Sequence, residues 1–203
     1  MSSSRQNQLQ SPLLRLPAEL RNRVYNYALS DWNIRIFYQE YSMKPVKRMF
    51  AICRPTYSNT GSWIPTNKAS LGLPSVCRQL NMETKLLPFT LNNEFGLETT
   101  RCLEKFIERL GHERRSLIAK VRLVVWNRTT GINYDAIAWL GVVAPGRLRE
   151  FPNLANVMLE VETTSPQSWA PLCDGMAKDL NSGKEKLGRK AIQVKLVCVK
   201  PRS

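Results

Sequence analysis

The middle of the chain reads Ile118-Ala119-Lys120-Val121-Arg122-Leu123-Val124-Val125, a run of strong strand formers with an apolar residue at every second position from Val121. The same apolar spacing returns at Leu154–Val161 and again at Ala191–Cys198. The three copies are offset by 36 and 37 residues. Three β-strands with long connections between them are therefore predicted to frame the second half of the fold.

Connections of this length favour a parallel sheet, because parallel neighbours need a crossover and the crossover is usually a right-handed helix. Helix-compatible segments lie between the copies at 134–143 and 168–180. Another lies before the first copy, at 100–115, where an amphipathic stripe consists of Leu103, Phe106, Ile107 and Leu110. The spacing resembles an irregular leucine-rich repeat, although the usual period of that repeat is shorter, about 20–29 residues. An ordinary small α/β sheet is the alternative.

The N-terminal half begins with a predicted helix. Residues 1–11 are polar and are expected to be loose. Proline suits the first position of a helix, so the helix is predicted to start at Pro17. Its apolar residues recur at spacings of four, four and three and would line one face: Leu16, Leu20, Val24 and Tyr27.

A β-hairpin and a second helix are predicted to follow. Alternation over 32–54 with a turn at 42–45 indicates the hairpin, and residues 55–70 have the composition of a loop. The second helix would start at Leu73 or Pro74 and stop at Pro88, before a short extended segment within 89–97. Its apolar face would consist of Val76, Leu80, Thr84 and Leu87.

The composition is that of an ordinary globular protein, except for its charge. The 203 residues carry a net charge of +14, and no apolar run approaches the roughly 20 residues that span a bilayer. The N-terminus lacks the apolar core of a secretory signal. We therefore expect an intracellular, soluble protein, cytoplasmic or nuclear, with no membrane partner. Five scattered cysteines without a Cys-x-x-Cys pair are expected to be reduced thiols: Cys53, Cys77, Cys102, Cys173 and Cys198.

The sequence offers little catalytic chemistry. His112 is the only histidine and follows Gly111, a predicted helix C-cap, so a solvated imidazole is expected there. No phosphate-binding glycine loop or nucleophile elbow occurs. Glu104 and Glu108 lie one helical turn apart, but Arg101 and Lys105 precede them by three residues, which favours a charge-paired surface. We predict a protein that is not an enzyme, with no cofactor and no metal site.

The positive charge raises the chance of binding nucleic acid or an acidic protein. Two groups of basic residues are the candidates, and the second also resembles a weak nuclear-import signal. The first group is Arg114, Arg115, Lys120 and Arg122, and the second is Lys184, Lys186, Arg189 and Lys190. No arrangement that would read a base sequence is recognised.

Two motifs in the first half carry a family resemblance. The first reads Leu16-Pro17-Ala18-Glu19-Leu20-Arg21-Asn22-Arg23-Val24-Tyr25, and the second Val76-Cys77-Arg78-Gln79-Leu80, followed by Glu83 and Leu87-Pro88-Phe89. The segment Leu117–Leu123 is similar to a strand that follows in the same proteins. On these motifs the chain resembles fungal F-box-like proteins, most of which have no assigned activity.

The resemblance implies a role in protein interaction. F-boxes are three-helix modules that bind a Skp-type adaptor and bring an unknown protein target to a cullin–RING ubiquitin ligase. Matched residue by residue, the partner-binding positions would be Leu16, Pro17, Leu20, Val24, Leu73, Val76, Cys77 and Leu80. Here some 40 residues separate the two elements, far more than in an F-box. A hairpin packed over the first helix would turn its apolar face into internal core.

The expected architecture is α+β, in three parts. A flexible N-terminus spans 1–11, and a split F-box-like helical module with an inserted β-hairpin spans 12–97. A C-terminal α/β, leucine-rich-repeat-like sheet of about three parallel strands spans 98–203. The leading hypothesis is a non-enzymatic interaction module, including a substrate receptor of a ubiquitin ligase. A basic module that binds nucleic acid or an acidic protein is the alternative.

Overall fold

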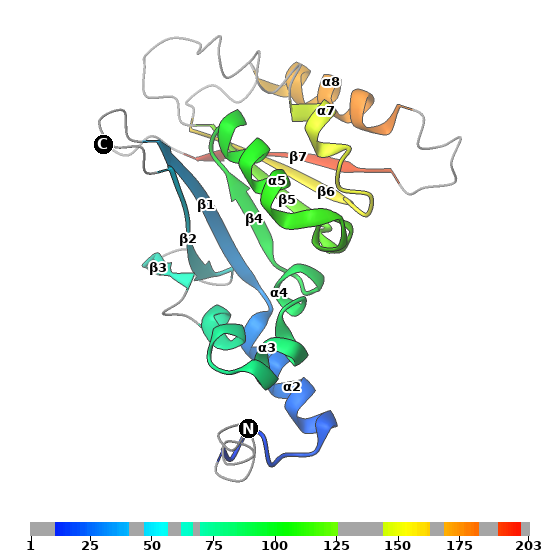
Figure 1. Cartoon of the computed structure of the whole chain (residues 1–203). Coiled ribbons are helices and arrows are strands. Elements are labelled where there is room, and N and C mark those ends of the chain that lie inside the picture. The colour runs from blue at the N-terminus through cyan, green and yellow to red at the C-terminus, as the bar shows by residue number, and fades with distance from the viewer. Residues whose placement is uncertain are drawn as a thin grey trace. The chain divides into compact units, whose positions relative to one another are not determined.

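A computed structural model describes residues 11–40, 47–56, 62–66, 70–125, 144–162, 169–182 and 191–199 (Figure 1). The described strands are β1 (Trp32–Glu40), β2 (Lys47–Pro55), β3 (Ile64–Pro65), β4 (Glu94–Leu97), β5 (Lys120–Val125), β6 (Asn156–Glu162) and β7 (Gln193–Val199). The described helices are α2 (Ala18–Leu29), the 3-10 helix η2 (Ser70–Ser75), α3 (Arg78–Thr84), α4 (Leu87–Thr90), α5 (Thr100–Leu117), α7 (Ala144–Leu148) and α8 (Ala170–Asn181). Helices and strands both form the described part of the chain, and they alternate from β4 onwards, so the protein belongs to the mixed α/β class.

The seven described strands form one mostly parallel sheet in the order β3-β2-β1-β4-β5-β6-β7. The pairs β4–β5, β5–β6 and β6–β7 are parallel, whereas β2–β3 is antiparallel. The parallel register places Val121 opposite Val157 and Val157 opposite Val194. These pairs are 36 and 37 residues apart, which are the offsets of the sequence repeat. The prediction of parallel strands linked by long connections is confirmed, and equivalent repeat positions lie side by side.

The chain divides into two compact units. The first comprises Met1–Ile34 and Ile52–Asn93, and the second Arg35–Ala51 and Glu94–Ser203. Strands β1 and β2 therefore contribute residues to both. The helical motifs of the F-box resemblance fall in the first unit, and the repeated strands fall in the second.

In the second unit, helices α5, α7 and α8 lie along one face of the sheet (Figure 1). The alternation of each strand turns one row of side chains towards these helices; the ring of Phe95 in β4 lies 5.6 Å from that of Phe106 in α5. The rows of β5 and β6 are buried: Val121, Leu123, Val125, Val157, Leu159 and Val161. The predicted stripe on α5 is confirmed, because all four residues are in the core. Thr99 caps this helix by accepting a hydrogen bond from the Cys102 amide at 3.1 Å.

Other expectations for the second half need correction. In the described part of the chain, the parallel strands number four rather than about three, because β4 joins the sheet ahead of β5. The predicted helix at 168–180 is present as α8, whereas the one at 134–143 lies outside the described residues. Neither a leucine-rich repeat nor an F-box module is identified in the described part of the chain. The sheet is the more ordinary α/β arrangement.

In the first unit, the predicted helices exist but differ in detail. Helix α2 begins at Ala18, with Pro17 as its N-cap. The predicted second helix is divided into η2, α3 and α4. Cys77 has an extended backbone (φ −155°, ψ 165°) that no helix accommodates, and it separates η2 from α3. Pro88 stands in the first turn of α4, where its missing N–H costs nothing, so it starts a helix rather than ending one.

The two strands of the predicted hairpin are hydrogen-bonded neighbours in the sheet. Only residues 41–46 connect β1 to β2, too few for a parallel crossover, so the pair is antiparallel. Phe37 and Phe50 stack across the pair with their ring centroids 5.0 Å apart. The predicted turn at 42–45 lies outside the described residues. The predicted loop at 55–70 contains the short strand β3, which pairs with β2.

Gly111 interrupts α5 and provides a test of backbone strain. Its φ of +66° and ψ of 166° lie in a region that is nearly closed to other residues, and helical geometry resumes after it. Gly111 thus ends a first helical segment, as the C-cap prediction expected, but a second segment follows it directly and the two form one kinked helix. An added Cβ would meet no atom within 4 Å. Gly111→Ala should therefore lower the free energy of unfolding by about 1–3 kcal/mol through strain alone, as measured by urea denaturation. An equal stability of the two proteins would contradict this.

Candidate docking surface

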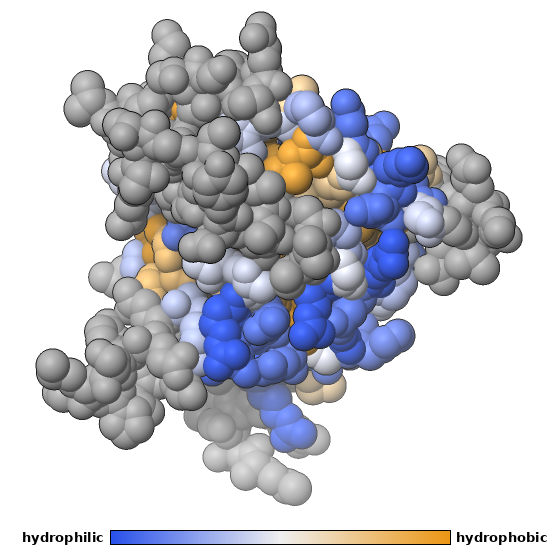
Figure 2. Space-filling view, turned by 90° about the horizontal axis from the view of Figure 1, so that it is seen from above, coloured by the Kyte–Doolittle hydropathy of each residue, from blue (hydrophilic) through white to orange (hydrophobic). Residues whose placement is uncertain are grey.

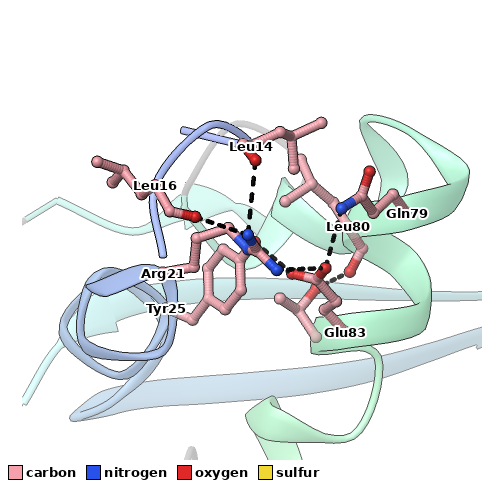
Figure 3. Close-up of polar contacts among 8 residues, drawn as sticks. Leu14, Leu16, Arg21, Tyr25, Gln79, Leu80 and Glu83 are labelled. Carbon is pink, nitrogen blue, oxygen red and sulfur yellow. Dashed lines mark hydrogen bonds and ion pairs between the residues drawn. The ribbon is translucent and has the colours of Figure 1, made fainter. Parts of the chain in front are cut away.

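Helices α2 and α3 of the first unit are joined by a polar cluster centred on one carboxylate. Arg21 donates from Nε to Glu83 Oε2 and from Nη2 to Glu83 Oε1, both at 3.2 Å. The Tyr25 hydroxyl donates to Oε2 at 2.7 Å, and Gln79 Nε2 donates to Oε1 at 3.1 Å. Figure 3 shows these side chains converging on Glu83. We name Arg21, Tyr25, Gln79 and Glu83 the clasp.

The clasp also holds the chain that leads into α2. Arg21 Nη1 donates to the carbonyl oxygen of Leu16 at 2.7 Å and to that of Leu14 at 3.5 Å. A guanidinium can do this because its five N–H groups point in several fixed directions. Beneath these contacts, the core of the unit consists of Leu14, Tyr25, Leu29 and Leu80. The hydrogen bonds and this small core together fix α2 against α3.

The ionisation of the clasp follows from its burial and its hydrogen bonds. Burial and the neighbouring Glu83 raise the pKa of Tyr25 to about 12, so the hydroxyl remains a donor. Burial acts to raise the pKa of Glu83 as well. The hydrogen bonds from Gln79, Tyr25 and Arg21 and the charge of Arg21 outweigh it and hold the pKa of Glu83 below its usual range. Glu83 is therefore ionised at neutral pH and pairs with Arg21.

With its inner side held by the clasp, α2 turns an apolar ridge outwards. Leu20 is 45% exposed, Val24 41% and Tyr27 90%. Their spacings of four and three residues place them on one side of the helix, and Tyr25 and Leu29 bury the other. We name Leu20, Val24 and Tyr27 the α2 ridge. Three residues of the predicted apolar face are thus exposed, and the fourth, Leu16, is half-buried.

The eight predicted partner-binding residues are distributed between surface and core. Pro17 is exposed with Leu20 and Val24, and Val76 is 69% exposed before α3. Leu16 is half-buried, and Leu73 and Cys77 are half-buried against the core cluster. Leu80 is only 5% exposed, so it packs inside the unit and is not available to a partner.

The first predicted basic group is described by the structure, and two of its members form ion pairs within the fold. Arg122 points at Glu94 and Glu160, and Arg115 pairs with Glu150. Arg114 is exposed and Lys120 half-buried, and both make interactions with other groups. The second group, Lys184, Lys186, Arg189 and Lys190, lies outside the described residues.

The contacts of Arg122 belong to a buried ion network in the second unit, on the face of the sheet opposite Val121 and Leu123. Glu160 accepts from Arg35 at 2.8 Å and from Arg122 at 2.6 Å, and Glu94 also pairs with Arg122. Arg35 reaches Glu98 at 3.8 Å. Burial acts to lower the pKa of Arg122, but its hydrogen bond to Glu160 and the two carboxylates raise it overall. These charges satisfy one another within the fold.

The candidate catalytic groups have ordinary surroundings. His112 is exposed. Glu104 and Glu108 pair with Arg101 and Lys105 respectively, so the prediction of a charge-paired helix surface is confirmed. All five cysteines are free thiols, and Cys53, Cys102 and Cys173 are buried. In the described segments, no group of three or more His, Cys, Asp or Glu side chains could hold a metal ion.

Among the described residues of the second unit, the large apolar side chains that are exposed are Phe50 and Val199, each 40% exposed. In the view of Figure 2, hydrophilic side chains cover much of the described surface and hydrophobic ones form separate patches. None of the described helices combines the length and apolar character needed to cross a membrane.

No family model, curated protein or solved structure matches the chain. The α2 ridge is therefore the candidate site, on the strength of its own geometry.

Proposed function

We propose that the chain is a non-enzymatic protein-interaction module that docks a Skp-type adaptor through the α2 ridge. It would thereby serve as a substrate receptor of a cullin–RING ubiquitin ligase. The observation that supports the proposal most is the exposure of Leu20 and Val24 on a helix whose other side is already packed. Apolar side chains repeated along one exposed helix side are the anchors by which helices dock on partner grooves.

The clasp supports the same proposal. A docking helix binds more tightly when it is held in its bound conformation beforehand, because less conformational entropy is lost on association. Arg21, Tyr25 and Glu83 hold α2 in this way without using any residue of the ridge. The residues proposed to bind are now Pro17, Leu20, Val24, Tyr27 and Val76, because Leu80 belongs to the core.

Leu20→Asp combined with Val24→Asp is expected to abolish capture of a purified Skp-type adaptor. Two carboxylates would have to lose their hydration at an apolar contact, so the dissociation constant should rise by at least about 100-fold. The measurement is biolayer interferometry with the full chain, beside a denaturation curve of each variant. Both side chains already lie at the surface, so folding should stay cooperative.

The matched control is Asn22→Asp combined with Asn26→Asp. It adds the same two charges at the same spacing on exposed positions of α2 that lie away from the ridge. Capture should survive in this variant. Equal capture by the ridge variant and the wild type, or no capture by the wild-type chain, would refute adaptor docking. Loss of folding in the ridge variant would show that the ridge is structural.

A further inference from the structure

A second exposed surface lies on α3, on the side opposite the core. Arg78, Met82 and Lys85 are spaced four and three residues apart, so they line one side of the helix and its C-cap, and all three are exposed. Leu80 and Thr84 bury the opposite side. Val76, just before α3, and Met82 are both 69% exposed. We name Val76, Arg78, Met82 and Lys85 the α3 stripe.

The charge of the α3 stripe is uncompensated within its own segment. Between residues 70 and 91 the only acidic residue is Glu83, and the clasp engages both of its oxygens. Neither Arg78 nor Lys85 forms an ion pair within the described part of the chain. The stripe thus presents two cations with an apolar methionine between them and a valine beside them.

We infer that the α3 stripe binds an acidic, apolar-anchored helical segment of a partner protein. Carboxylates are the natural counterpart of Arg78 and Lys85, which are about 10 Å apart along the helix at 1.5 Å per residue. Two acidic residues seven positions apart on a partner helix match this separation. Met82 lies between the cations and adapts its shape to an apolar side chain placed between the two carboxylates. Charge complementarity of this kind favours partner segments that carry negative charge and disfavours those that carry positive charge.

The same surface fits nucleic acid less well. Phosphate recognition needs positive charge only, and it leaves Val76 and Met82 exposed to water beside the backbone. The inference does not rest on adaptor docking, although Val76 belongs to both proposed surfaces; the substitutions that test each surface leave Val76 unchanged. Tyr25 and Gln79 both donate to Glu83 in the clasp, and neither belongs to the α2 ridge or to the α3 stripe.

The test uses the full chain and a fluorescent 18-residue helical peptide of defined design. The peptide carries Glu at positions i and i+7 and Leu at i+3 and i+4, and its affinity is measured by fluorescence anisotropy. Arg78→Glu combined with Lys85→Glu is expected to weaken binding by about 100-fold, and Met82→Ser by about tenfold. A peptide with serine in place of both leucines should bind about tenfold more weakly than the parent.

The matched control is Arg15→Glu combined with Arg23→Glu, which reverses two exposed cations elsewhere in the unit. Its dissociation constant for the peptide should stay within about twofold of the wild-type value. The variant Leu20→Asp/Val24→Asp should also retain peptide binding, which separates this test from that of the adaptor. Equal weakening by both charge reversals would overturn the inference in favour of a general charge effect. The inference would also be overturned, in favour of nucleic acid, if an 18-nucleotide single-stranded DNA bound more tightly than the peptide and Met82→Ser left that binding unchanged.

Discussion

Glu83→Ala is expected to lower the free energy of unfolding by about 3 kcal/mol. The substitution removes the acceptor of four hydrogen bonds and leaves the Arg21 guanidinium and the Tyr25 hydroxyl partly buried without their main partner. The Arg21 side chain is only 18% exposed, so water replaces the lost contacts incompletely. Urea denaturation followed by circular dichroism measures the change. Glu19→Ala, an exposed glutamate of α2, is the matched control and should change stability by less than about 0.5 kcal/mol.

A double-mutant cycle and a pH series separate the ion pair from general packing. Arg21→Met with Glu83→Ala should reveal a coupling of about 1–2 kcal/mol. The pKa of Glu83 is lowered by folding. Its contribution is therefore present above the unfolded value of about 4.3 and is lost as the pH falls through the folded value. The stability of Glu83→Gln should fall less steeply in this acid range than that of the wild type. Parallel acid curves, or no coupling, would show that the clasp contributes little.

The parallel sheet could be predicted from sequence because the same alternation of apolar residues recurs in its strands. The described parallel strands have one side turned towards helices, so apolar residues recur at every second position. Val121, Val157 and Val194 occupy equivalent places in three copies, and they are adjacent in the register. The stripe of α5 was predictable for the same reason. Local periodicity is enough to predict a helix or strand and its buried side where one whole side of the element packs in the core.

The orientation of α2 could not be predicted in this way. Its leucine, valine and tyrosine at helical spacing look like a core face, yet the buried side is formed by Tyr25 and Leu29. The orientation is fixed by the small core that includes Tyr25 and Leu29, together with the pairing of Arg21 with Glu83, 62 residues further along the chain. A single sequence does not show which distant charges will meet. The polar members of the two motifs carried the signal, because Arg21, Tyr25, Gln79 and Glu83 all belong to the F-box-like pattern.

The role of Arg122 was missed for a related reason. A basic residue within an apolar strand suggests a surface cation, and Arg122 was accordingly a candidate for phosphate binding. In the sheet, β5 and β6 are neighbours, and Arg122 and Glu160 lie two register positions apart on adjacent strands. Arg35 of β1 reaches the same glutamate from a strand more than 100 residues away in sequence. Only the strand order brings these charges together.

Glu160→Ala is therefore expected to be among the most destabilising single substitutions, lowering the free energy of unfolding by about 3–5 kcal/mol. Each oxygen of this carboxylate accepts from a different arginine, Arg35 at 2.8 Å and Arg122 at 2.6 Å. Removing it leaves two buried guanidinium groups close together with less compensating charge. The repulsion and the desolvation of two cations then act against folding, whereas the unfolded chain is unaffected.

Glu150→Ala provides the matched comparison for this prediction. Glu150 also pairs with two arginines, Arg115 and Arg147, but its side chain is 32% exposed, against 9% for Glu160. Water can solvate the groups left behind, so the loss should not exceed about 1 kcal/mol. Denaturation of both variants under identical conditions tests the difference. If the two substitutions cost the same, the network around Glu160 contributes no more than a surface ion pair, and the stability of the second unit would have to come from its apolar rows alone.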